Sequence, residues 1–226
     1  MDYPQVYIGN IESYSGSTPS AIGKRQIDGS LMLTPLGLAG DEQAEKRVHG
    51  GPDRALCHYP REHYEHWRQQ FPEQAESFTA PSFGENISTE GLTEDNVYIG
   101  DIFRWGEALI QVTQPRSPCY KLNFHFGIED LSVLMQQTGL CGWLYRVVSA
   151  GKVSDEQPLT LITRNSEISV AEAIAVSFHM PFDEEEYRRL LSAAGLSASW
   201  SKAMVMRLTG GEIENFNHRL LGRAST

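Results

Sequence analysis

Residues 96–113 decide the fold, and their sequence is NVYIGDIFRWGEALIQVT. Short apolar segments alternate in this stretch with two pairs of residues, Gly100-Asp101 and Gly106-Glu107. Glycine beside an acidic residue is typical of a tight turn, and short apolar segments bounded by such turns are typical of strands. The pattern therefore predicts consecutive strands at residues 96–99, 102–105 and 108–113.

Further short strands are predicted on both sides of this stretch, at residues 6–11, 21–27, 31–34, 55–59, 143–148 and 159–163. Few helices interrupt them. One is predicted to begin at Pro60 and to run to about Gln70, and another covers residues 129–137 and ends at Gly139. Many short strands at close spacing predict a mainly β fold, with the strands in a closed or nearly closed barrel.

The pattern becomes helical towards the C-terminus. N-cap spacing predicts three helix starts, at Ser169 with Glu172, at Asp183 with Glu186, and at Ser199. Gly210-Gly211 would end the third helix. The sequence therefore predicts an α+β chain with a β-barrel domain over residues 1–166 and a small three-helix domain over residues 167–226.

The composition is that of a folded globular protein, with 226 residues, 40% hydrophobic and 21% charged. Lysine and arginine number 19 and the acids 29, so the net charge is −10, which disfavours polymeric nucleic acid as a partner. No apolar run reaches the roughly 18 residues of a membrane-spanning helix, and the N-terminus lacks a secretory pattern. The three cysteines show no disulfide spacing, so we expect a cytoplasmic protein that does not contact a membrane.

The glycine pair Gly50-Gly51 is the first candidate site. Adjacent glycines let backbone N–H groups approach an anion closely, and His49 and Arg54 would add charge-assisted donors on either side. A turn before Pro52 explains the same pair, and spacing by itself favours that turn.

Asn86, in the run Phe83-Gly84-Glu85-Asn86, is the second candidate. Its amide has both a donor and an acceptor with which to bind the edge of a heterocycle. The alternative is an Asx-type turn into the next strand, which is favoured when the run is considered by itself.

Cys119 is the third candidate and lies in the run Gln114-Pro115-Arg116-Ser117-Pro118-Cys119-Tyr120-Lys121. The two prolines restrict the backbone, while Arg116 and Lys121 place positive charge near the sulfur and favour its thiolate form. A thiolate is a ligand for soft or thiophilic metals. The alternative is a small packing residue, a role that we assign to Cys57 and Cys141 because neither has such a setting.

Together and in this order, these motifs resemble the MOSC domain family. The resemblance is carried by Gly40-Asp41, residues 48–55 (VHGGPDRA), the Phe83-Gly84-Glu85-Asn86 run, Ile99-Gly100-Asp101 and the cysteine run. The helical tail is similar to the three-helix module of the YiiM-type bacterial members, so the resemblance covers nearly the whole chain. It implies a β-barrel with a few peripheral helices that binds the pterin-based molybdenum cofactor, molybdopterin.

The resemblance also implies roles for individual residues. Cys119 would ligate the molybdenum, and His49 would take part in catalysis beside it by relaying protons. The cofactor-binding residues would be Lys24, His49, Gly50, Gly51, Arg54, Asn86, Arg116, Ser117 and Lys121. Arginine and lysine suit the phosphate of the cofactor, whereas Asn86 and backbone groups suit its pterin ring.

The implied activity is that of an oxidoreductase that detoxifies N-hydroxylated bases, such as N-hydroxylaminopurine, and related N-hydroxylated compounds by reducing them to the amines. This reaction needs two electrons that no ordinary side chain supplies, so it requires the cofactor and an electron-donating reductase partner. The alternative is a non-catalytic carrier that holds molybdenum cofactor or sulfur through Cys119. The helical module either offers a docking surface for an electron donor or covers the barrel. The oligomeric state stays open.

Overall fold

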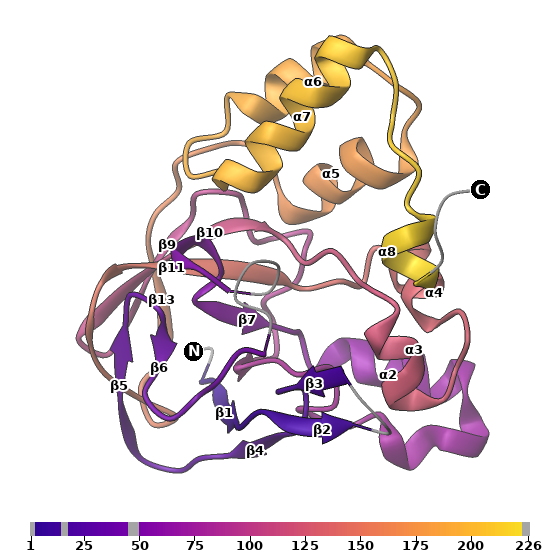
Figure 1. Cartoon of the computed structure of the whole chain (residues 1–226). Coiled ribbons are helices and arrows are strands. Elements are labelled where there is room, and N and C mark those ends of the chain that lie inside the picture. The colour runs from indigo at the N-terminus through magenta and orange to yellow at the C-terminus, as the bar shows by residue number, and fades with distance from the viewer. Residues whose placement is uncertain (1–2, 15–17, 45–49, 223–226) are drawn as a thin grey trace.

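The computed structural model describes residues 3–14, 18–44 and 50–222. A strand-rich part carries a helical module made of α5 (Val170–Ile174), α6 (Glu184–Leu191) and α7 (Ala198–Gly210), which is at the top of Figure 1. Within the described ranges, no helix is both long and apolar enough to span a membrane.

The centre of the strand-rich part is a curled sheet, which has eight strands within the described residues. Its order is β13 (Leu159–Thr163), β9 (Ile102–Trp105), β10 (Ala108–Pro115), β11 (Trp143–Ser149), β7 (Leu56–His58), β8 (Ile87–Ser88), β1 (Gln5–Gly9) and β4 (Lys24–Gln26). The edge strands β13 and β4 do not pair with each other in this part of the chain. The predicted mainly β, α+β fold is confirmed, and the barrel is a half-barrel.

The β9–β10 hairpin has the predicted form. Phe103 pairs with Ile110 and Trp105 with Ala108, and Gly106 makes the turn between them with φ 56°. Phe103 and Trp105 are buried while Arg104 between them is exposed, as expected where side chains alternate across a strand. The segments 102–105 and 159–163 are therefore confirmed as strands.

The prediction of a strand at residues 96–99 is wrong. The chain turns there, because the Asp101 carboxylate accepts the Tyr98 N–H (3.0 Å) and the Thr93 carbonyl accepts the Val97 N–H (3.0 Å). Val97 and Ile99 are fully buried. The segment is apolar because it packs in the core, although it does not join a sheet.

Smaller elements complete the strand-rich part. In the described residues, β12 (Gly151–Ser154), β5 (Ser30–Thr34) and β6 (Gly37–Leu38) form one small sheet, and β2 (Glu12–Tyr14) and β3 (Thr18–Ser20) form another. The helices of this part are α2 (Glu62–Gln70), α3 (Lys121–Phe126) and α4 (Leu131–Thr138), with the 3-10 turns η1 (Pro52–Arg54) and η2 (Pro72–Ser77). Gly139 ends α4 with φ 76°, as predicted.

The helical module begins at the predicted capping box. The Ser169 hydroxyl accepts the Glu172 N–H (3.1 Å) and the Glu172 carboxylate accepts the Ser169 N–H (2.8 Å). Helix α5 then continues into the π-helical turn η3 (Ala175–His179). Asp183 caps α6 by accepting the Glu186 N–H (3.1 Å).

The cap predicted at Ser199 is wrong. Ser197 caps α7, because its hydroxyl accepts the Trp200 N–H (3.2 Å), and the hydroxyl of Ser199 has partners in the strand-rich part instead. A further helix that the sequence analysis missed, α8 (Asn217–Leu221), follows the module. It packs against α4, away from α6 and α7 (Figure 1).

Aromatic side chains fill the core next to α2. The rings of Tyr59 and Phe83 lie 4.5 Å apart, and the Trp67 indole N–H donates to the Tyr59 hydroxyl (2.6 Å). Phe78 and Phe126 stack at 4.7 Å in the same cluster.

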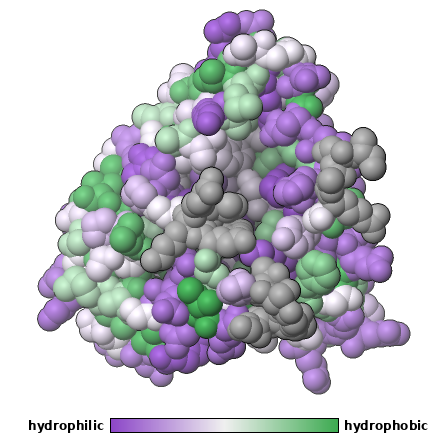
Figure 2. All heavy atoms as spheres, viewed as in Figure 1, coloured by the Kyte–Doolittle hydropathy of each residue, from purple (hydrophilic) through white to green (hydrophobic). Residues whose placement is uncertain are grey.

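In contrast, the face of the molecule in Figure 2 is mostly hydrophilic, and its apolar residues form small separate patches.

Glu85 is a carboxyl group buried beside this aromatic cluster. Its side chain has no exposed surface, and Tyr64 donates a hydrogen bond to Oε1 (2.5 Å), while Oε2 has no hydrogen-bond partner in the described residues. Burial raises the pKa of Glu85 to about 7, and the bond from Tyr64 and the charge of Arg116 oppose this shift in part. Ionised Glu85 therefore lowers stability.

We expect Glu85→Gln to remove a pH dependence of stability. Because the pKa of about 7 in the fold exceeds the ordinary 4.5, the native state holds the proton more tightly than the unfolded state. The free energy of unfolding then falls as the pH rises from about 4.5 to about 7, by about 3 kcal/mol in total. Urea unfolding at pH 5 and pH 8 measures this fall in the free energy of unfolding.

From pH 5 to pH 8, the free energy of unfolding of Glu85→Gln should rise relative to that of the wild type. Glu76→Gln is the control, because Glu76 is exposed on η2. This variant should show the same difference in unfolding free energy between pH 5 and pH 8 as the wild type. An equal free-energy difference between Glu85→Gln and wild type at both pH values would show that Glu85 does not have the raised pKa.

Candidate functional site

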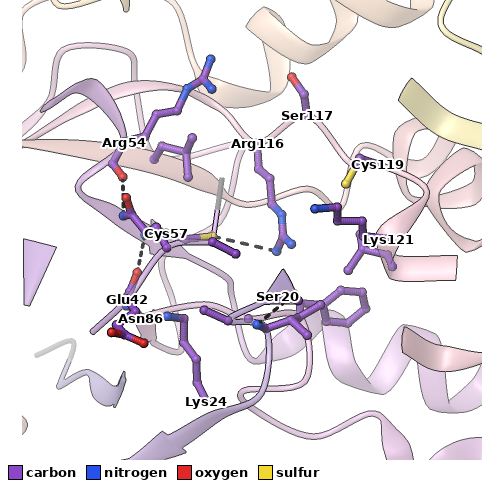
Figure 3. A pocket seen from close by; sticks show the side chains of 18 of the residues that line it. Ser20, Lys24, Glu42, Arg54, Cys57, Asn86, Arg116, Ser117, Cys119 and Lys121 are labelled. Atoms are coloured by element: carbon purple, nitrogen blue, oxygen red, sulfur yellow. Dashed lines mark hydrogen bonds between the residues drawn. The ribbon is translucent and has the colours of Figure 1, made fainter. Parts of the chain in front are cut away.

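A cavity of about 360 Å³ lies where distant parts of the chain meet. Its lining includes Lys24 from β4, Arg54 from η1, Cys57 from β7, the cysteine run with Arg116, Ser117 and Cys119, Lys121 at the start of α3, and Arg219 from α8. Figure 3 shows Arg116 projecting into the cavity between the sulfur atoms of Cys57 and Cys119.

The charged side chains of the lining are mostly basic. Among the described residues, Lys24, Arg54, Arg116, Lys121 and Arg219 contribute five basic side chains, against the two acids Asp41 and Glu42. A chain with a net charge of −10 therefore gathers positive charge at this cavity. Such a concentration favours an anionic ligand.

Hydrogen bonds hold the chain on both sides of Cys119. Strand β10 ends at Pro115, and the Arg116 N–H donates to the Gly142 carbonyl (3.0 Å). The Leu122 N–H donates to the carbonyl of Cys119 itself (3.0 Å), where α3 begins. Cys119 is half-buried and lines the cavity, so its sulfur is held in a structured loop and can reach a ligand.

Cys57, which the sequence analysis assigned to packing, also lines the cavity. Its Sγ lies 3.9 Å from the guanidinium Nη1 of Arg116. Burial raises the pKa of the Cys57 thiol, and the charge of Arg116 opposes this in part. A raised pKa disfavours the thiolate, which is the form that binds a metal. Cys141 is fully buried and does pack in the core.

Asn86 lines the cavity, but its amide is already bonded within the protein. Its Oδ1 accepts the Cys57 N–H (3.1 Å), and its Nδ2 donates to the Tyr7 carbonyl (3.2 Å) and to Asp41 (2.7 Å). Both N–H groups of the amide are used, so the expected binding of a heterocycle edge does not fit this geometry. Asn86 holds β7 and β1 together instead.

Lys24 is paired with Asp41, and the two side chains are only 5% and 3% exposed. Asp41 also accepts the Gly9 N–H (2.8 Å) and the amide of Asn86. The Asp41 carboxylate thus balances the charge of Lys24 and fixes one wall of the cavity. Sequence reasoning missed Asp41 as a site residue, although it belongs to the Gly40-Asp41 motif.

Arg54 connects the cavity to the helical module. Its Nη2 donates to the hydroxyl of Ser199 on α7 (2.9 Å). The neighbouring Asp53 accepts the Ala198 N–H at the start of α7 (3.0 Å) and the Nε–H of Arg146 on β11 (3.0 Å). The residues after the glycine pair therefore join the sheet to the module.

The glycine pair itself forms a turn. The Arg54 N–H donates to the Gly51 carbonyl (2.9 Å), and Gly51 has φ 99°, which favours glycine. Neither Gly50 nor Gly51 belongs to the cavity lining that the structure describes. The turn interpretation fits this geometry better than an anion-binding nest. The predicted residue His49 lies outside the described residues.

Arg219 also lines the cavity, and nothing near it in the sequence indicates this. It is about a hundred residues from Cys119 along the chain and lies in a short helix without a side-chain N-cap. Ser117 and Lys121, in contrast, lie where the cysteine run predicts them, in the cavity lining.

Comparison with known proteins shows what this arrangement is similar to. The MOSC domain family matches residues 45–160, and the YiiM-like, 3-alpha helix domain matches residues 168–211. The chain is 65% identical to protein YiiM of Escherichia coli over 224 residues, which are 99% of this chain and the whole of that protein. The crystal structure of YiiM from Escherichia coli superposes with a TM-score of 0.87 at 58% identity and covers 98% of both chains.

A protein of Gibberella moniliformis named Reductase is also similar. It is 36% identical over 163 residues, which are 71% of this chain but 29% of that longer protein. The matches to the two domains agree with the curled sheet and the helical module seen here. The chain therefore belongs to the MOSC domain family, and within it to the YiiM-type proteins that carry a three-helix domain after the MOSC domain.

Proposed function

We propose that the cavity binds the pterin-based molybdenum cofactor, with Cys119 as a ligand to the metal. The single observation that carries the proposal is a half-buried thiol in a cavity whose charged side chains are mostly basic. MOSC domains generally bind this cofactor, so membership of the family supports the same conclusion.

The residues present fit such a group. Arg54, Arg116, Lys121 and Arg219 line the cavity and suit an anionic phosphate, because arginine and lysine donate strong charge-assisted hydrogen bonds to it. The Cys119 sulfur suits a thiophilic metal. Lys24 is the least suited of the predicted cations, since Asp41 already balances its charge.

We further propose that the protein reduces N-hydroxylated bases and related compounds to the amines. Conversion of an N–OH group to N–H consumes two electrons and two protons and releases water. The cofactor would supply the electrons when bound. The chain would supply the positive lining that holds the cofactor, and His49 stays a candidate for passing protons to the substrate.

An electron-donating partner is part of this proposal. The relative named Reductase contains a segment similar to this chain and a much longer remainder. The name of that relative supports an oxidoreductase activity. Here the donor would be a separate reductase.

Cys119→Ser is expected to abolish metal binding. The protein is purified from a host that makes the cofactor, and molybdenum and pterin are measured per chain. Since oxygen is a poorer ligand than thiolate for a thiophilic metal, we expect at least about a tenfold loss of molybdenum. Cys57→Ser is the matched control, because it removes the other sulfur of the same cavity and should retain the metal.

Equal molybdenum in Cys119→Ser and wild type would exclude Cys119 as the ligand. A wild type without either molybdenum or pterin would contradict the cofactor proposal as a whole.

Turnover tests the reaction itself. Loaded protein, an N-hydroxylated purine and a reductase with its electron source should yield the aminopurine, detected by chromatography, and Cys119→Ser should yield none above background. Cofactor retained without turnover across several reductases would instead favour a carrier of cofactor or sulfur.

A further inference from the structure

Helix α8 contributes to the cavity although it lies beyond both matched domains. The match to the three-helix domain ends at residue 211, whereas α8 covers Asn217–Leu221. In Figure 1 it lies against α4 and near α3, away from α6 and α7. Any role of α8 therefore has to be derived from its own contacts.

Backbone groups hold α8 against the segment that contains Cys119. The Leu220 carbonyl accepts the hydroxyl of Ser132 on α4 (2.6 Å), and the Arg219 carbonyl accepts the Tyr120 N–H (2.9 Å). Gly222 ends the helix with φ 68°, and a Cβ there would lie 3.1 Å from the Tyr120 ring. Glycine thus permits the close approach of α8 to the residue after Cys119.

The side chain of Arg219 reaches the residue before Cys119. Its Nη1 donates to the Pro118 carbonyl (2.5 Å) and its Nη2 to the Gln136 amide oxygen of α4 (2.5 Å). The guanidinium carbon also lies 5.1 Å from the Phe178 ring and 5.2 Å from the Phe216 ring. This planar group is therefore held by two hydrogen bonds and two aromatic faces.

We propose that Arg219 is the positioning residue for Cys119. It bonds to the chain immediately before Cys119 through its side chain and immediately after it through its backbone. These two bonds limit how the sulfur can move relative to the cavity, which Arg219 also lines. What Cys119 does with that position rests on the proposed function, whereas the positioning does not.

Arg207 is a matched control from the helical module. Arg207 is buried and, like the half-buried Arg219, packs near the Phe216 ring (5.6 Å). Its hydrogen bonds go to the Ser177 carbonyl and to Glu214, and none that the structure describes goes to the cysteine run. Replacing either arginine could loosen the helical module, but only the replacement of Arg219 should loosen the segment around Cys119.

The test measures hydrogen–deuterium exchange of the cofactor-free protein in a peptide spanning residues 117–122. In Arg219→Gln we expect exchange at least about tenfold faster than in wild type, since hydrogen bonds to a charged donor are lost. Arg207→Gln should exchange as wild type does in this peptide, even where its Tm is lower. Molybdenum per chain, measured in loaded protein, should fall in Arg219→Gln and recover in part in Arg219→Lys.

Gln136→Ala gives a second measurement in case Arg219→Gln does not fold. It keeps the charge of Arg219 but removes the acceptor that orients it, so exchange in the same peptide should also rise. Unchanged exchange in the folded Arg219 or Gln136 variants would overturn the proposal while leaving the cofactor function intact. Faster exchange in a protein that never holds molybdenum would support the positioning of Cys119 and contradict the proposed function.

Discussion

Gathering positive side chains around one cavity is the constraint on which the rest of the structure depends. Like charges in a partly buried space repel, so each must have partners that keep it in place. Asp41 balances Lys24, Ser199 accepts from Arg54, and the Pro118 carbonyl accepts from Arg219. These partners come from three different regions of the chain. The fold must therefore be complete before the cavity exists in this form.

Features that depend on neighbouring residues could be predicted from the sequence. Gly106 makes the expected turn because its positive φ and the flanking strands are local properties. The capping box of Ser169 and Glu172 forms because both partners lie within one helical turn. The apolar segment at 96–99 shows the limit of such reasoning. Val97 and Ile99 in this segment are buried, but whether a buried segment pairs in a sheet depends on contacts that sequence spacing does not contain.

Features that depend on distant residues could not be predicted in this way. Ser197 and Ser199 are equivalent as caps in the sequence, and the choice between them follows from Arg54 and Gln114, which bind the Ser199 hydroxyl. The sequence does not show which partners the Asn86 amide has, and in the fold it forms hydrogen bonds with Tyr7, Asp41 and Cys57. In the site, the prolines and cations of the cysteine run identified Cys119 and Lys121, whereas nothing near Arg219 indicated that it approaches them.

The helical module takes part in building the site as well as covering the sheet. Asp53 accepts both from Arg146 of the sheet and from the first N–H of α7, so the position of the module is tied to β11. Through Ser199, that same helix end holds Arg54 at one side of the cavity. The chain after the module then returns to the strand-rich part, where α8 holds the other side through Arg219. Because two walls of the cavity are fixed by residues that follow the MOSC domain in sequence, the module and the segment after it belong to the same functional unit as Cys119.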